Sequence, residues 1–417
     1  MEPKGCTSTN GSLKYVSPIE KNYNDLIMKY FYAFFALLMI PFWAIGQEKS
    51  TVPPIQKHHT KDFYTIDVFA AYQEKKQLLL SQIADDVEFI PLETTGACLL
   101  DKNPQIIITE KEVFIFDYIK GYRFNRQGKF MNVIGSKGQG PADFVKPMCM
   151  EVDTINQWVY FLDHKKIIKY NYAGKHIESF SSAFGDYLFV FNTTGQFVID
   201  NSNYLFAKPN ERFSIYLFSE NEKRLVSKFA CDYKEKIPAL SICYPIAYKY
   251  DNNLFLKDYW SDTLYLMKGV HDAYSYAVVQ KGRFIHRNVS DQSLITGKQS
   301  SEDRFILEVV QISESSRFFI LLTNKGTVVF DKKERKTYLD DFVENRINIE
   351  NDLYGGIVNQ PIRKIDRNKA ITYSYSNEMI MTNKRLINDE RYQSYKKMVE
   401  NRNEEDNPII ILIKLKE

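Results

Sequence analysis

The feature that most constrains the fold is an internal repeat. Residues 113–130, VFIFDYIKGYRFNRQGKF, align without a gap with residues 159–176, VYFLDHKKIIKYNYAGKH, at an offset of 46 residues (159 − 113). Each copy predicts a short strand, an Asp turn, a second strand, an Asn-x-x-Gly hairpin and a third strand, because glycine supplies the positive φ of a tight hairpin. Five identities recur: Val113/Val159, Asp117/Asp163, Asn125/Asn171, Gly128/Gly174 and Lys129/Lys175.

Weaker copies of this unit begin near residues 203, 253, 317 and 369, which makes six units at uneven spacing. Repeats of roughly 40–50 residues with several short strands each are typical of a β-propeller. The 28 Tyr and 29 Phe residues agree with this, since aromatic residues favour strands. The sequence therefore predicts an all-β fold, one six-bladed β-propeller over residues 78–417. Insertions around residues 231–250 and 281–304 are predicted to lie in loops on one face.

The C-terminal end predicts a closure of the ring. Asn388–Asn403 carries apolar residues at three- and four-residue steps and predicts a short amphipathic helix. Ile409–Leu415, IIILIKL, predicts a strand that pairs with Val87–Ile90. Such a pairing of the two ends would leave no exposed sheet edge.

The N-terminal end has the parts of a secretory signal. A lysine at 29 precedes the apolar run of residues 31–46, FYAFFALLMIPFWAIG, which ends in small residues. We expect a signal peptide over residues 28–46 and a linker or lead-in over 47–77. Residues 1–27 are interpreted as a misassigned upstream segment, with the start open between Met1 and Met28. The competing interpretation is a short membrane anchor, although the run is shorter than the ~20 residues of a spanning helix. Export to the periplasm or the cell exterior is expected, with no stable membrane span in the mature chain.

Charge and cysteine content exclude several classes of protein. The net charge is +3 without a block of one sign, which gives no reason to expect nucleic acid as a partner. The five cysteines form no CxxC pair, so a zinc ribbon or a thioredoxin motif has no spacing to rest on. In an oxidising compartment Cys231 and Cys243 could form a disulfide, and the alternative is a set of buried thiols.

Four segments resemble the six-bladed β-propeller proteins abundant in Bacteroidetes, which are related in architecture to NHL-repeat propellers. The segments are VEFIPLETT at 87–95, RFNRQGKFMNVIGSKGQGPADF at 123–144, YWSDTLY at 259–265 and DNPIIILIKLK at 406–416. The resemblance covers about residues 80–417 and implies export and a propeller, without an agreed activity. The family usually has a second glycine and a glutamate where this chain has Ala142 and Asp143. No lipobox cysteine follows the apolar run, so a lipid-anchored form is not implied.

The candidate ligand-binding residues come from turns and loops. The glycine loop after residue 134 offers Lys137, Gln139 and Asp143, although its GxxGxG order matches neither phosphate-binding motif and a structural connection is the main alternative. His164 follows the repeat aspartate Asp163. Tyr259 and Trp260 could stack on a sugar ring or simply pack at the rim. Asp117 and Asp163 are expected to form Asx turns, with a ring of acids around a cation as the alternative.

No catalytic motif is present. The six histidines have no ligand spacing, and GxSxG and HExxH are absent. No cofactor is predicted, although a calcium or zinc ion stays open. The leading hypothesis is an exported, non-catalytic binding module of the cell envelope whose ligand is a glycan, a peptide or a protein. The alternatives are a polysaccharide lyase or hydrolase, an NHL-like metal-dependent lyase, and a scaffold without a pocket.

Overall fold

The structure is a computed structural model of the chain. It describes residues 52–61, 63–74, 78–101, 103–163, 166–182, 189–192, 194–201, 207–233, 244–284, 306–341, 349, 351–353, 364–366, 368–385 and 393–417. The predicted signal peptide and the segment before it, together with His164, Cys243 and His286, lie outside these residues.

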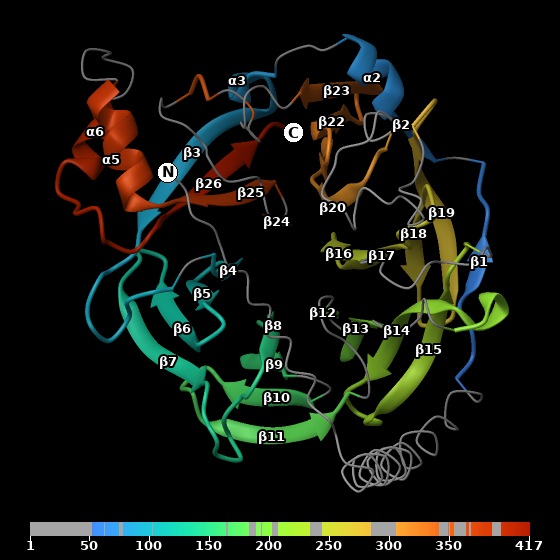
Figure 1. Ribbon diagram of the computed structural model, residues 1–417, viewed down its shortest axis with the longest axis horizontal. Helices are drawn as coiled ribbons and strands as arrows, with labels where there is room; N and C mark the ends of the chain where they lie inside the picture. Colours follow the sequence, from blue (N-terminus) through green and yellow to red (C-terminus); the bar gives the residue numbers. More distant parts are fainter. Residues whose placement is uncertain are drawn as a thin grey trace, which may run out of the picture. The chain divides into compact units, whose positions relative to one another are not determined.

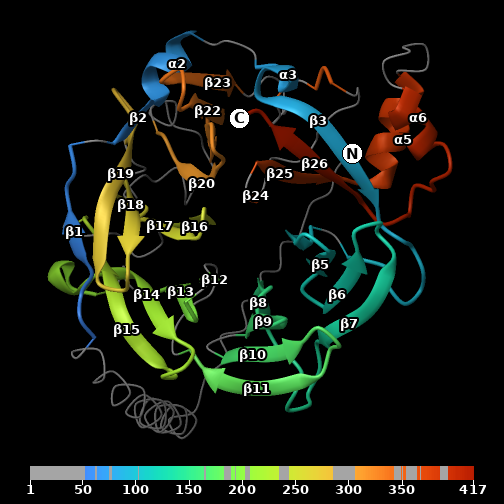
Figure 2. The same ribbon diagram turned by 180° about the vertical axis from the view of Figure 1, so that it is seen from behind.

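The described strands form six sheets arranged in a ring, which confirms the six-bladed β-propeller (Figure 1). Both views place the first strand of each sheet nearest the centre of the ring (Figure 2). Blade 1 is β4 (Gln105–Ile108), β5 (Glu112–Phe116), β6 (Lys120–Asn125) and β7 (Phe130–Ser136); blade 2 is β8 (Pro147–Asp153), β9 (Trp158–Asp163), β10 (Lys166–Asn171) and β11 (His176–Ser181); blade 3 is β12 (Phe189–Phe191), β13 (Gln196–Asp200), β14 (Phe213–Ser219) and β15 (Arg224–Ala230).

The other half of the ring has the same strand order. Blade 4 is β16 (Ile246–Tyr250), β17 (Asn253–Lys257), β18 (Thr263–Lys268) and β19 (Asp272–Gln280); blade 5 is β20 (Val309–Glu314), β21 (Phe318–Thr323), β22 (Gly326–Asp331) and β23 (Lys336–Asp341). Blade 6 combines both ends of the propeller: β24 (Lys364–Asp366), β25 (Lys369–Ser374), β26 (Ile409–Leu415) and β3 (Ala84–Pro91).

Antiparallel pairing within each blade gives the ring two distinct faces. Successive strands run in opposite directions, so the turn from the second to the third strand lies at the same end as the connection to the next blade. We call this end the loop face. The turns between first and second strands and between third and fourth strands define the opposite, hairpin face. The predicted insertions around 231–250 and 281–304 lie mostly outside the described residues, and β16 occupies the end of the first range.

Aromatic side chains fill the spaces between neighbouring blades. Both sides of each central strand are covered by adjacent sheets, and all of β9 except its first residue is buried. At the boundary of blades 1 and 2, Phe116 and Phe161 meet edge-on with ring centroids 5.2 Å apart. The repeat in sequence is thus a repeat in space, with β5 to β7 equivalent to β9 to β11.

The ring closes as the sequence predicts. β26 pairs antiparallel with β3, and Ile410 lies opposite Ile90 while Ile413 lies opposite Val87. Beside this pairing, the buried Asn407 side chain accepts a hydrogen bond from Leu100 N at 2.9 Å and donates to Glu93 O and Cys98 O at 2.7 Å each. The two ends of the propeller are therefore joined through both backbone and side chain.

Some predicted elements differ from the structure. A helix α6 (Gln393–Val399) lies within the predicted Asn388–Asn403 helix, but a second helix α5 (Ser376–Arg385) replaces the end of the strand unit expected to extend to Ile380. The buried Ser376 hydroxyl donates to Asn407 O, which ends β25 and turns the chain into this helix. The third unit was placed near residue 203, whereas its second strand, β13, begins earlier, at Gln196.

The predicted linker also contributes to the ring. β1 (Gln56–His58) and β2 (Tyr64–Asp67) pair parallel with β19, the outer strand of blade 4. The short helix α2 (Val68–Glu74) follows, with Val68 and Ala71 buried, and α3 (Leu80–Ile83) leads into β3. These strands cover a sheet edge, which explains why residues of polar composition become ordered here.

Candidate binding face

The glycine loop between β7 and β8 is a closed, well-anchored connection. Lys137 and Phe144 form an isolated parallel β-bridge, in which Gly138 N donates to Phe144 O at 3.1 Å. The Asp143 carboxylate fills the space where side chains on Gly138 and Gly140 would stand, and it accepts a hydrogen bond from Gly140 N at 2.8 Å. Among the three loop candidates, Asp143 is thus occupied within the loop, whereas Lys137 and Gln139 are exposed.

The repeat aspartates hold the loop face through backbone hydrogen bonds. Asp117 Oδ1 accepts from Ile119 N at 2.9 Å and from Lys120 N at 2.7 Å, which confirms the predicted Asx turn. Asp163 Oδ1 accepts from Lys146 N at 2.5 Å, and Oδ2 accepts from Val145 N at 3.1 Å. Asp117 Oδ2 likewise accepts from Asp101 N at 3.2 Å, in the connection before blade 1. Both acids therefore hold the connection that enters their own blade, and Asp117 also holds its own turn.

The segments held by Asp117 and Asp163 carry exposed apolar side chains. Tyr118 is 44% exposed, Ile119 43% and Val145 57%. Tyr118 has a φ of +67°, a conformation that a bulky residue adopts only when the surrounding structure enforces it. Lys137 N donates to Ile119 O at 2.8 Å, so the turn and the loop form one surface. Sequence inspection missed this trio, because neither a positive φ nor exposure of an apolar residue can be read from residue types.

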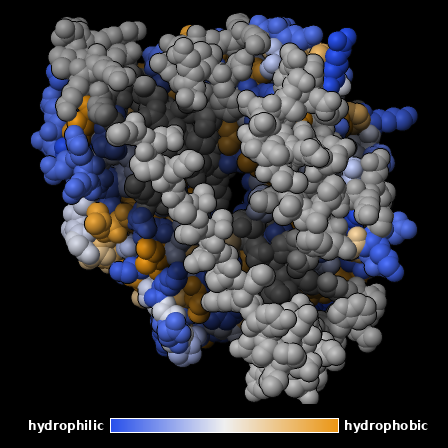
Figure 3. Space-filling model, viewed as in Figure 1, coloured by the Kyte–Doolittle hydropathy of each residue, from blue (hydrophilic) through white to orange (hydrophobic). Residues whose placement is uncertain are grey.

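The loop face carries most of the exposed large apolar side chains. Ten such side chains are exposed in the described part of the chain, and six of them lie in or beside turns and connections of the loop face: Leu99, Tyr118, Ile119, Val145, Tyr244 and Val310. On one side of the molecule, apolar residues gather among polar ones over the region of β4 to β11 (Figure 3). Tyr118, Ile119 and Val145 lie on neighbouring segments, and contiguous exposed apolar residues of this kind mark interaction surfaces.

The aromatic pair of blade 4 is mainly packing. Trp260 is buried and stacks on Tyr233 with ring centroids 4.3 Å apart. Its backbone N–H donates to Asp258 Oδ2. The Tyr259 hydroxyl donates to Glu308 Oε1 at 3.1 Å, which links blades 4 and 5. The structure places this pair in the same face as the glycine loop, but three blades along the ring from its start in blade 1.

A buried charged cluster lies directly beneath this turn. Burial, and then the nearby Lys281 ammonium, lower the pKa of Lys257 to about 8. Lys257 Nζ donates to Asp258 O at 3.0 Å, and Lys281 Nζ lies 2.5 Å from Asp262 Oδ1. Burial also raises the pKa of the Cys231 thiol. Perturbed groups of this kind are frequent at functional sites, but ion-pair networks within a fold shift pKa values in the same way.

A second buried network joins blades 4 and 5 on the hairpin face. Tyr248 and Tyr276 donate to the Glu314 carboxylate at 2.7 and 2.6 Å, and Lys332 Nζ lies 2.5 Å from it. Burial raises the pKa of Glu314, and the hydrogen bonds and the Lys332 charge oppose this. The Glu314 carboxylate thus has hydrogen-bond and ion-pair partners within the fold, and the network links blades 4 and 5.

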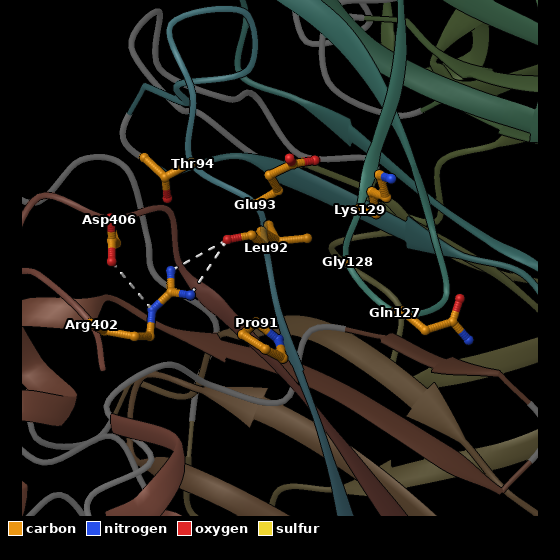
Figure 4. Close-up of a pocket in the computed structure, with 9 residues that line it drawn as sticks. All are labelled: Pro91, Leu92, Glu93, Thr94, Gln127, Gly128, Lys129, Arg402 and Asp406. Carbon is orange, nitrogen blue, oxygen red and sulfur yellow. Dashed lines mark hydrogen bonds and ion pairs between the residues drawn. The ribbon is translucent and has the colours of Figure 1, made fainter. Parts of the chain in front are cut away.

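An open pocket of about 390 Å³ lies where the ring closes (Figure 4). It is lined by the end of β3, by the hairpin at Gly128 and by the segment after α6. Arg402 donates to Leu92 O at 3.4 Å, and also to Ser376 Oγ at 3.0 Å and to Asn407 O. The Arg402 guanidinium is hydrogen-bonded to these partners, so it is not available to bind an anion in the pocket. The pocket marks the place where the two ends of the propeller meet.

Metal ligands do not converge in the residues that the structure describes. No group of three or more His, Cys, Asp or Glu side chains there could hold an ion. His271 lies in the β18–β19 hairpin, and His164 and His286 lie outside the described residues, so a metal site built from these histidines stays untested. The Cys231–Cys243 pairing also stays a prediction, since Cys243 is not described. Cys98 is buried and free.

The sheets, their ring and the loop face define the class: a six-bladed β-propeller with an apolar, turn-built face. The chain belongs to the family described as a domain of unknown function (DUF4934), which matches residues 63–414. Comparison with curated proteins gave no match.

A solved structure shares the fold. It is a protein of Bacteroides fragilis NCTC 9343 described as exported, 18% identical with a TM-score of 0.61, over 88% of this chain and 100% of its own. More distant similarity is found to a member of the DUF4221 family from Bacteroides vulgatus, 8% identical with a TM-score of 0.49, over 82% of this chain and 99% of its own. A streptogramin B lyase is 12% identical over 69% of this chain and 80% of its own, with a TM-score of 0.39. The NHL-like relationship stays a prediction.

Proposed function

We propose that the protein is exported and works as a non-catalytic binding module of the cell envelope that uses its loop face. The observation that carries this is the set of exposed apolar side chains on turns that buried aspartates hold in place. A rigid ring of loops is a good base for binding, because little ordering is left to occur when the ligand arrives.

Export is supported by two observations. The apolar run over residues 31–46 has the length and the ending of a signal peptide, and the Bacteroides fragilis protein of similar fold is described as exported. In the described residues no helix is long and apolar enough to cross a membrane. The test is cell fractionation with N-terminal sequencing of the mature protein. Cleavage near Gly46 and recovery outside the cytoplasm are expected, and an intact chain in the cytoplasm would disprove export.

The binding function is tested against the enzymatic alternative on the same purified protein. Glycan arrays and displayed peptide libraries should give a ligand whose binding is lost when loop-face residues are changed. Elemental analysis before and after chelation, with thermal melting, tests the alternative. A stoichiometric metal whose removal lowers the melting temperature, together with turnover of a polysaccharide, would replace the binding module with a metal-dependent enzyme.

A further inference from the structure

We propose that Tyr118, Ile119 and Val145, bordered by Lys137 and Lys146, bind an extended segment of a partner protein that carries apolar and acidic side chains. We call these five residues the Tyr118 surface. The proposal rests on the proposed binding function and adds the place and the chemistry of the partner. It is independent of where in the envelope the partner occurs.

The Tyr118 surface is continuous and rigid. Ile119 O accepts from Lys137 N, Lys137 bridges to Phe144, and Phe144 precedes Val145 directly. Below it, the Phe144 ring is buried and lies 5.0 Å from the Phe161 ring between centroids. Two buried carboxylates then fix the backbone at both ends of the surface, that of Asp117 at Ile119 and that of Asp163 at Val145. A partner would therefore meet a preformed site.

Tyr118 holds a strained backbone conformation at an exposed turn. At a φ of +67°, glycine or asparagine would be accommodated with less strain than tyrosine. The ring lies 5.0 Å from Phe116, and the residue is 44% exposed. Strain of this kind at an exposed turn is typical of a residue used for recognition. Tyrosine is also among the residues that contribute most to protein interfaces.

The charge around the surface selects an acidic partner. Lys137 and Lys146 are exposed, and among the described residues neither forms an ion pair. Two of the nearby acids are hydrogen-bonded within the fold: Asp143 accepts from Gly140 N, and Asp163 accepts from two backbone N–H groups and lies 3.8 Å from Lys166 Nζ. The exposed ammonium groups of Lys137 and Lys146 would attract a carboxylate on the partner.

The composition of the surface favours a protein segment over a sugar. Sugar sites use aromatic planes with amide and carboxylate groups around them, and this surface has one aromatic ring among aliphatic and cationic side chains. An apolar centre with a charged rim is the usual arrangement of a protein interface. The apolar part of the surface has three side chains, far fewer than the roughly 20–30 residues a side of a stable globular interface, so an extended segment fits it better than a globular partner.

The experiment uses the full chain and a phage-displayed library of random dodecapeptides, followed by fluorescence anisotropy on synthetic copies of the enriched peptides. Enriched peptides should combine Phe, Leu or Trp with Asp or Glu. Tyr118→Gly, which relieves the backbone, and Val145→Ser should each weaken binding tenfold or more without lowering the melting temperature. Lys137→Glu with Lys146→Glu should also weaken it tenfold, and should shift selection towards Lys- and Arg-containing peptides.

Matched controls lie on the hairpin face. Ile155 is 70% exposed in the β8–β9 turn, and Lys175 is exposed in the β10–β11 hairpin. Ile155→Ser and Lys175→Glu should change affinity less than twofold. Affinity for the acidic peptides should also fall as salt is raised from 50 to 300 mM, since exposed charges are screened.

Each contrary result has its own meaning. Enriched peptides that bind equally well to the Tyr118→Gly and Val145→Ser variants would overturn the proposed surface and leave the binding function standing. Enrichment of basic or uncharged peptides would overturn the partner chemistry. Binding of phosphatidylglycerol vesicles or of arrayed glycans through the same residues, without any peptide, would replace the protein segment with that ligand. Failure of every probe would count against the proposed function itself.

Discussion

Glu151 and Lys249 form an ion pair although they belong to blades that are not neighbours. Lys249 Nζ, on the inner strand β16 of blade 4, lies 3.6 Å from Glu151 Oε2, on the inner strand β8 of blade 2. The two side chains thus reach past β12, the short inner strand of blade 3. Only a closed ring brings these positions together, and the contact ties opposite sides of blade 3 at the centre of the propeller.

The pair should contribute measurably to stability. Lys249→Met leaves the Glu151 carboxylate, which is 8% exposed, without its counter-charge, and we expect a loss of about 1 kcal/mol in the free energy of unfolding at pH 7. Urea titration of wild type, Lys249→Met, Glu151→Gln and the double variant gives the coupling energy. Lys268→Met, on an exposed position of blade 4, is the control. A coupling energy of zero would show that the pair is incidental.

Lys257 should make the protein more stable in mild alkali. Its ammonium is buried and its pKa is lowered to about 8, below the ordinary value of 10.5. Between these two values the unfolded chain binds a proton that the folded chain does not, so stability rises with pH. From pH 7.5 to 9.5 we expect this rise to be roughly 1–2 kcal/mol.

Lys257→Met keeps the unbranched side chain and removes the titration. Urea titrations of both proteins at pH 7.5 and 9.5 should show the rise in the wild type and a smaller one in the variant, since Lys281 and Lys332 titrate in both. Lys268→Met should behave as the wild type does. Equal pH dependence in wild type and Lys257→Met would mean that Lys257 keeps an ordinary pKa.

Gly128 is required for contact between blades as well as for its turn. Its φ is +79°, and a Cβ there would lie 2.1 Å from Pro91 O on the outer strand of blade 6. The repeat-equivalent Gly174, at φ +80°, would meet Val133 O of blade 1 at 2.4 Å. The Gly128 and Gly174 hairpins therefore each pack against the preceding blade. This contact requires the glycine of the shared Asn-x-x-Gly sequence.

Alanine substitutions separate the two demands on these glycines. Gly195 has a φ of +78°, but a Cβ added there would lie 3.7 Å from its nearest neighbour, Asn221 Nδ2. Gly195→Ala should therefore lower the free energy of unfolding by about 1 kcal/mol, for conformation alone. Gly128→Ala and Gly174→Ala should each cost at least about 2 kcal/mol more, because blade packing must shift to remove the clash. Thermal and urea unfolding measure the difference, and equal losses at all three positions would rule out the docking role.

Asn407 should be a main determinant of ring closure. Its side chain satisfies Leu100 N, Glu93 O and Cys98 O, and its own N–H donates to Thr94 Oγ1 at 2.9 Å. Asn407→Leu would remove all three of these side-chain hydrogen bonds, the one to Cys98 O being buried, for an expected loss of about 3 kcal/mol. Hydrogen exchange should increase first in β26 and β3. The exposed Asn401→Ala is the control, and a variant as stable as wild type would contradict the role.

The sequence alone determined much of the architecture. The gap-free repeat of residues 113–130 at 159–176, with Asp turns and Asn-x-x-Gly hairpins, predicted blades with the observed strand pairing, and the apolar 409–415 run predicted closure on Val87–Ile90. These features are local, since strand alternation and turn chemistry depend on residues close in the chain. Helix α5 was missed because KAITYSYSNEMI favours a strand until Ser376 is tied to Asn407 across the closure.

Only the tertiary structure decided the candidate face. Asp117 and Asp163 accept hydrogen bonds from backbone groups outside their own turns, Asp117 from Asp101 N and Asp163 from Val145 N. Tyr118 has a positive φ and stays exposed in the structure, and Glu151 meets Lys249 because the ring brings blades 2 and 4 together. Such relationships depend on residues far apart in the chain, where hydrogen-bond partners and solvent exposure are set by packing between blades, so no pattern within a single segment contains them.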